Sequence, residues 1–241
     1  MKLITANEKM ADAVHGNYLL IPVINRFGIR LGFGDQTIGA VCANAGIDTD
    51  FFLAIINAFS NEDYFPAKKL RAVNVLTIVS YLKKTHDYYR RTLIPVIESY
   101  IAALLAKSLK RNPGLRLVKK FFLEYKKELF AHLRSEETRT FPYIEMVYRL
   151  HAAPGTPRVR KDLRRYSMDV YEREHHEVDE KLTDLKNILI KYIGGEFDDA
   201  VCSAIVFELF RLEKDILDHT RIENIVLMPM VAEMEKALRL R

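Results

Sequence analysis

The sequence contains few residues that break helices and few that cross-link chains. Its 241 residues include ten glycines, eight prolines, two cysteines and no tryptophan. Together with a hydrophobic content near one half, this composition excludes a collagen-like or disordered chain and favours a globular protein rich in long helices. Cys42 and Cys202 stand far apart without a CxxC motif. We therefore interpret both as reduced core residues rather than as a redox pair.

Long apolar runs are also missing. No stretch of about eighteen apolar residues occurs, so the sequence predicts no transmembrane helix. The opening stretch "MKLITANEKMADAV" lacks the apolar core of a signal peptide, and we expect a cytoplasmic protein. The net charge of +5 is modest, and basic runs such as "RVRKDLRR" at 158–165 are typical of solvated helix faces, so nucleic-acid binding is not the favoured interpretation.

Glycine and proline divide the chain into two parts. More than half of the glycines fall in the first 60 residues, where the pattern predicts a small helical N-terminal domain over 1–62. Its short helices are expected at 8–15, 17–27, 37–45 and 48–59. Asp48 and Thr49 suit the N-cap of the last helix, and Gly46 suits the end of the helix before it. The stretch "SNEDYFP" at 60–66 then serves as a linker.

Four long periodic segments follow over 66–241. The breaks between them are "RNPG", "AAPGTP" and "IGGE", each rich in residues that end helices. Long helices with short connections predict an all-α, up-down-up-down four-helix bundle, in which metal and cofactor sites are built from inward-facing side chains.

Each of the four predicted helices carries one histidine in line with its apolar residues. These histidines are His86, His132, His175 and His219, at separations of 46, 43 and 44 residues. In an antiparallel bundle, near-equal spacing can bring all four to a similar level. Glu136 and Glu223 each follow a histidine by four residues, which places them on the same buried face.

A metal ion accounts for these polar residues in the apolar faces. A buried carboxylate costs several kcal/mol unless a cation or hydrogen bonds compensate it, and no lysine or arginine shares these faces. Imidazole and carboxylate donors without thiolate suit iron, manganese or zinc. Two glutamates from different helices could each bridge a pair of metal ions.

The motifs carry a resemblance to a known class. The sequence reads "HDYYRRTLIP" at 86–95, "HLRSEETRTFP" at 132–142, "EHHEVDEKL" at 174–182 and "HTRIENIVLMP" at 219–229. These resemble the hemerythrin-like proteins and, more closely, the family called repair of iron centres. The resemblance covers about 68–238, and the stretch "INRFGIRLGFGDQTIGAVCANAGID" is similar to that family's small N-terminal domain.

The resemblance implies a ligand set and a function. His86, His132, His175 and His219 would be iron ligands, and Glu136 and Glu223 would bridge two irons. The protein would help to restore iron–sulfur centres after oxidative or nitrosative stress. Its partners would be iron–sulfur proteins, with dioxygen or nitric oxide as small ligands.

Two departures from the family pattern stand out. The family has a fifth histidine between the counterparts of His86 and His132, and here only Ser108 and Asn112 lie near the expected place. An adjacent cysteine pair of the family's N-terminal domain is replaced by "LGFGD" at 31–35.

Several residues near the proposed ligands have less certain roles. Tyr89, Tyr125 and Tyr171 are core residues or hydrogen-bond partners of a ligand. Glu137 is expected to face solvent. His15 and His151 are left without a role in the site.

Two other interpretations remain. One is an oxygen, nitric-oxide or iron sensor whose segment "TIGAVCANAGIDTDFFLAIINAF" forms a helix-turn-helix-like DNA-binding element. The other is a structural bundle that binds zinc without chemistry. Iron and zinc are distinguishable by colour, since zinc is spectroscopically silent.

Overall fold

The computed structural model describes residues 3–108, 112, 114–152 and 177–239. Within these ranges the secondary structure is helical, apart from a single isolated bridge between Lys9 and Thr37. The predicted all-α class is confirmed. No helix in the described part of the chain is long and apolar enough to cross a membrane.

The chain divides into two compact units, which are described separately. The N-terminal unit comprises Met1–Thr85 and Asp218–Met230, and the bundle unit comprises His86–Leu217 and Val231–Arg241. This division follows spatial contacts. The boundary predicted at 62–66 from composition concerns independent domains and stays a prediction.

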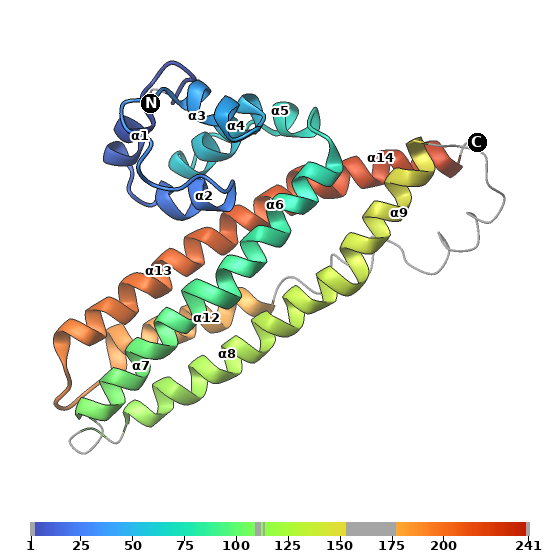
Figure 1. The fold of residues 1–241 in the computed structure, drawn as a ribbon. Helices are drawn as coiled ribbons and strands as arrows, with labels where there is room; N and C mark the ends of the chain where they lie inside the picture. Colours follow the sequence, from blue (N-terminus) through green and yellow to red (C-terminus); the bar gives the residue numbers. More distant parts are fainter. Residues whose placement is uncertain (1–2, 109–111, 113, 153–176, 240–241) are drawn as a thin grey trace. The chain divides into compact units, whose positions relative to one another are not determined.

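Short helices form most of the N-terminal unit (Figure 1). They are α1 (Met10–Gly16), α2 (Leu20–Arg26), α3 (Ile38–Asn44), α4 (Thr49–Ser60) and α5 (Ala67–Arg71), followed by the start of α6 (Val75–Tyr88). The Asp48 side chain accepts a hydrogen bond from Phe51 N at 2.8 Å and so caps α4 as predicted. Gly46, with φ of +64°, makes the turn after α3 in the left-handed region that glycine tolerates.

Aromatic side chains hold this unit together. Phe27 packs against Phe51, Phe52 and Tyr81 with ring centroids 5.0 to 5.6 Å apart. Tyr81 lies on α6, so the cluster fixes the short helices against the helix that leads to His86.

Long helices form the bundle unit. In chain order they are η1 (Tyr89–Leu93) and α7 (Ile94–Ser108), then α8 (Leu115–Ser135), η2 (Glu136–Thr140) and α9 (Phe141–Ala152), and then α12 (Glu177–Asn187) with η3 (Ile188–Tyr192). The last long helix is α13 (Asp199–Ile222), which continues through η4 (Glu223–Leu227) into α14 (Met228–Arg239). Each η segment is a π-helical turn within a longer helix.

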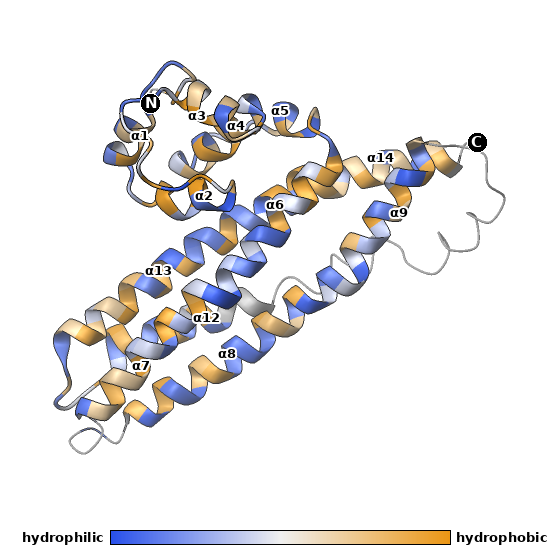
Figure 2. Ribbon diagram, in the orientation of Figure 1, coloured by the Kyte–Doolittle hydropathy of each residue, from blue (hydrophilic) through white to orange (hydrophobic). Residues whose placement is uncertain are grey.

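One apolar core joins α7, α8, α12 and the bundle part of α13. Figure 1 shows these helices side by side, and Figure 2 shows that apolar and polar residues alternate along them. Burial of the apolar faces supplies most of the stability of such helices. Fully buried members of this core include Leu104, Leu115, Phe122, Leu185 and Leu209.

Leu209 and Phe207 provide a test of this core, since they are near neighbours on α13 with opposite environments. Leu209 is 0% exposed and Phe207 is 74% exposed. We expect Leu209→Ala to lower the free energy of unfolding by about 3 kcal/mol, because it leaves a cavity. Phe207→Ala should change it by less than about 0.5 kcal/mol. Urea unfolding of the metal-free protein measures both, and equal losses would show that the helix faces the other way.

Candidate metal centre

Three long helices place the predicted ligands beside π-helical turns. His86 lies three residues before η1, while Glu136 and Glu223 are the first residues of η2 and η4. In each turn a backbone N–H bonds the carbonyl five residues earlier: Ile94 to Tyr89, Phe141 to Glu136 and Met228 to Glu223. Single π-turns inside α-helices are frequent at functional sites.

Proline explains where these turns occur. The residue after each π-turn's last bond is a proline, at positions 95, 142 and 229. A proline has no N–H to donate, and its ring crowds the carbonyl four residues earlier. The wider turn just before the proline accommodates both effects. It starts at a candidate ligand in η2 and η4 and three residues after one in η1.

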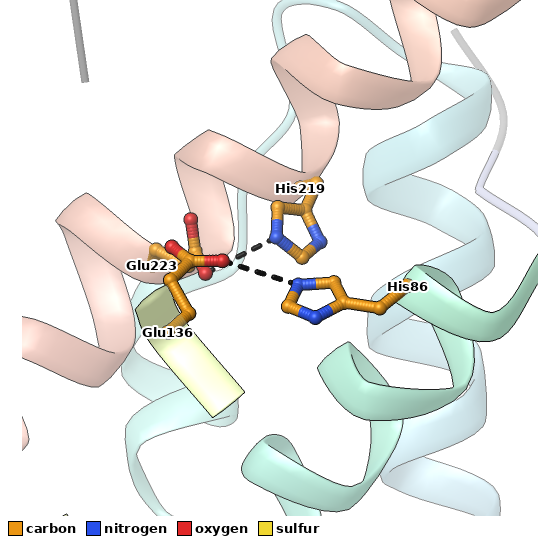
Figure 3. A group of neighbouring side chains, drawn as sticks. All are labelled: His86, Glu136, His219 and Glu223. Atoms are coloured by element: carbon orange, nitrogen blue, oxygen red, sulfur yellow. Dashed lines mark ion pairs between the residues drawn. The ribbon is translucent and has the colours of Figure 1, made fainter. Parts of the chain in front are cut away.

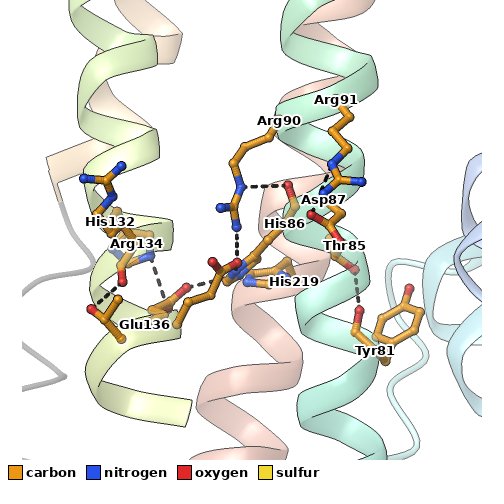
Figure 4. A network of polar contacts seen from close by, with 12 residues as sticks. Tyr81, Thr85, His86, Asp87, Arg90, Arg91, His132, Arg134, Glu136 and His219 are labelled. Atoms are coloured by element: carbon orange, nitrogen blue, oxygen red, sulfur yellow. Dashed lines mark hydrogen bonds and ion pairs between the residues drawn. The ribbon is translucent and has the colours of Figure 1, made fainter. Parts of the chain in front are cut away.

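Glu136 lies between two imidazoles. Its Oε2 is 3.2 Å from His86 Nε2, and its Oε1 is 3.3 Å from His132 Nε2 (Figure 4). Glu136 is 2% exposed and His86 is 0% exposed. Donor atoms bound to one ion at roughly 2.1 Å lie about 3 Å apart, so each N···O pair has the spacing of neighbouring ligands. A carboxylate whose two oxygens face two imidazoles is suited to bridge two metal ions.

His219 and Glu223 form a second pair on the last long helix. They are one helical turn apart, with His219 Nε2 3.1 Å from Glu223 Oε1. Both side chains are buried, and Glu223 is 0% exposed. The spacing of four residues therefore produces the same imidazole–carboxylate contact here as between His132 and Glu136.

Four of the predicted ligands form one group of neighbouring side chains. His86, Glu136, His219 and Glu223 each offer a donor atom, and these atoms all lie within 4.8 Å of one another (Figure 3). All four are buried. Two carboxylates this close in a buried setting repel each other, and a cation removes that repulsion. The donor set of imidazole nitrogen and carboxylate oxygen fits iron, manganese or zinc.

The other two predicted ligands are His132 and His175. His132 contacts Glu136 and lies outside the group of four, with its side chain partly exposed. His175 lies outside the described residues. The assignment of all six residues as ligands stays a prediction.

Glu137 does not have the solvent-facing role expected from the sequence. Its Oε1 lies 2.9 Å from His86 Nδ1, and it also forms an ion pair with Arg90. The hydrogen bond with His86, and then that with Arg90, holds the pKa of the Glu137 carboxyl below its usual range, although burial opposes this. When Nδ1–H donates to Glu137, the Nε2 lone pair of His86 is available toward Glu136, which is the arrangement that orients a metal-binding histidine.

Ser108 and Asn112 cannot replace the family's fifth histidine. The helix runs from His86 through η1 to Ser108, which lies roughly 33 Å farther along the axis at 1.5 Å per residue. There Ser108 Oγ accepts a hydrogen bond from Asp198 N at 3.0 Å, and the Asn112 side chain donates to the Gly194 carbonyl. Both residues close the end of the bundle unit. The residues between His86 and His132 form one helix that leads away from His86 and a second helix, α8, that contains His132.

Other polar and aromatic residues flank the candidate ligands. The Tyr89 hydroxyl donates to Asp215 Oδ1 at 2.9 Å, and both residues are buried. The sequence pattern missed Asp215, although it lies four residues before His219. The Phe141 ring stacks on His86 with centroids 5.4 Å apart.

The remaining residues of the sequence interpretation have separate positions. Tyr125 is buried in the bundle core and Tyr171 lies outside the described residues. His15 is exposed on α1, and His151 is near the end of α9.

Comparison with known proteins gives one family. The model of the hemerythrin HHE cation-binding domain matches residues 77–231, which is well over half of the chain and includes every candidate ligand. A search of curated proteins found no match.

Substitution of the adjacent residues Glu136 and Glu137 separates a metal ligand from a residue that orients one. Glu136→Gln should weaken metal binding by more than about 100-fold, since the amide offers one donor oxygen in place of two. Glu137→Gln should weaken it by about 10- to 100-fold, because His86 loses its charged partner. Anaerobic calorimetric titration with ferrous iron measures both affinities.

Glu124→Gln, an exposed change on α8, is the matched control and should leave the affinity unchanged. Wild-type affinity in Glu136→Gln would contradict the bridging role.

Proposed function

The chain belongs to the hemerythrin HHE cation-binding domain family, and on this premise we propose that it is a non-haem di-iron protein that helps to repair iron–sulfur centres damaged by oxidative or nitrosative stress. The observation that carries the di-iron part is Glu136, whose two carboxylate oxygens each face a different imidazole. The repair role rests on the four motifs that resemble the repair of iron centres family. The cytoplasm is the proposed setting.

The proposal assigns the ligands to helices. His86, His132 and His219 supply imidazole nitrogens, while Glu136 and Glu223 supply carboxylates, with His175 as the further predicted ligand. Bound iron would supply a redox-active Lewis acid able to take dioxygen or nitric oxide as a ligand. The protein's own contribution is to keep the donor atoms buried and close to one another.

A charged network at the edge of the site orients the first of these ligands. Glu137 accepts from His86 Nδ1 and is itself paired with Arg90. Because Glu137 is about one-quarter exposed, this network connects a fully buried imidazole to the solvent. When Nδ1 carries the hydrogen that Glu137 accepts, Nε2 is the nitrogen available to a metal.

The DNA-binding sensor is less well supported. Its second helix would be α4, in which Phe51, Phe52 and six further residues are buried. The exposed position on α4 is Asp50, an acidic residue. A helix that enters the major groove needs a free face with donors and positive charge, and α4 has neither.

Iron content and nitric-oxide chemistry test the proposal together. Protein purified with iron supplied should contain close to two irons per chain by elemental analysis and should absorb in the near-ultraviolet and visible. The reduced form should develop a nitrosyl band with nitric oxide and should transfer iron to an apo-acceptor protein that is supplied with sulfide, so that the cluster forms again. Colourless protein with zinc would support the structural bundle instead. Two irons without a nitrosyl band and without iron transfer would remove the repair role and leave the metal site.

Glu136→Gln serves as the control in each assay, since it should lose iron, colour and transfer together.

A further inference from the structure

Pro229 leaves a gap in the hydrogen bonding of the last long helix. In a continuous α-helix the N–H of residue 229 would donate to the carbonyl of Ile225, and proline has no N–H. The π-turn that begins at Glu223 bonds that residue's own carbonyl to Met228 N. The unfilled carbonyl therefore lies two residues after a candidate ligand, inside the turn that sets the direction of its side chain.

Arg71 fills this gap. Its Nε and Nη2 lie 3.1 Å and 2.7 Å from the Ile225 carbonyl oxygen, so one guanidinium gives two hydrogen bonds to one acceptor. Such bonds are charge-assisted and stronger than those between neutral groups. Arg71 is the last residue of α5, so it reaches this helix from a segment about 150 residues earlier in the chain.

A second contact from the same segment lies on the other side of Glu223. The guanidinium of Arg221 lies over the Phe65 ring, 4.7 Å from its centroid. Phe65 directly precedes Pro66, the N-cap of α5. The stretch from Phe65 to Arg71 therefore contacts the helix two residues before Glu223 and two residues after it.

We propose that Arg71 is a positioning residue for the metal ligand Glu223, acting through the carbonyl that Pro229 leaves free. This inference rests on the proposed function in taking Glu223 as a ligand. Glu223 is fully buried, and its Oε1 lies 3.1 Å from His219 Nε2. The wide turn of the η4 backbone directs this carboxylate, and Arg71 binds that turn at the Ile225 carbonyl, to which Pro229 cannot donate. Arg71 thereby controls how firmly Glu223 holds the metal.

A double-mutant cycle between Arg71 and Pro229 tests this mechanism. Arg71→Ala should speed the release of ferrous iron to the chelator ferrozine by about fivefold, as expected for the loss of a charge-assisted bond at a partly exposed site. Pro229→Ala supplies the missing N–H. In that background the same Arg71 change should therefore have little effect. Arg71→Lys should fall between, since an ammonium lacks the planar fork.

Lys69→Ala is the matched control, because it removes the same charge from the same helix and should release iron at the wild-type rate. An Arg71→Ala effect of equal size with and without Pro229, or no effect on release, would overturn the inference. Hydrogen exchange at amides 223–228 of the metal-free protein reports the contact independently of metal and should increase in Arg71→Ala alone. Wild-type protein that binds no iron would overturn the proposed function and this inference together. Iron binding with no energetic coupling between the Arg71 and Pro229 substitutions would overturn the inference alone.

Discussion

The structure depends on carboxylates that are buried beside imidazoles on the apolar faces of long helices. A carboxylate in such a place has left water, which costs free energy unless a cation or hydrogen bonds compensate it. Glu136 and Glu223 are each almost completely buried, and both contact imidazoles, which bind metal only when neutral. A cation satisfies both donor types at once. The cost of the buried charges is therefore tied to metal binding, and the helices around them must be held by contacts elsewhere.

Those contacts come from the apolar core on one side and from the π-turns on the other. Buried residues such as Leu129, Leu133 and Leu212 belong to this core and lie on the same helices as candidate ligands. The π-turns then set the local direction of each helix at the ligand. Three prolines in equivalent positions produce three equivalent turns, so a single local device is used on three helices. In the repeated spacing, the histidine and the glutamate supply donor atoms, and the proline fixes the position of the π-turn.

The sequence was sufficient for the features that arise from periodicity. A histidine and a glutamate four residues apart must share a helix face, so the contacts of Glu136 with His132 and of Glu223 with His219 follow from the spacing alone. The caps of the short N-terminal helices were also predictable, since Asp48 and Gly46 each suit one local conformation. The family match then agrees with the class that the motifs suggested.

Contacts between different helices were not predictable in the same way. Glu137 follows the candidate ligand Glu136 and is rotated about 100° from it around the helix axis. When this helix is considered alone, that rotation predicts a side chain that faces solvent. The neighbouring helix carries His86 and Arg90 to that side, and the exposed face becomes part of the site. The position of the fifth histidine was misjudged for a related reason. Ser108 was chosen from its position in the sequence alone. The helix from His86 to Ser108 is long, so Ser108 lies at the far end of the bundle unit.

These two kinds of contact have different parts in the candidate metal centre. The donors that touch the metal are buried and fixed by helical spacing, so they cannot adjust without unfolding a turn. The residues that orient them are partly exposed and belong to other helices, as Glu137 does for His86 and Arg71 does for the turn at Glu223. Water and a partner protein can reach the second kind and not the first. Under the proposed function, metal release would therefore be controlled at the orienting residues, where a change of about 1.4 kcal/mol alters affinity about tenfold without removing a ligand.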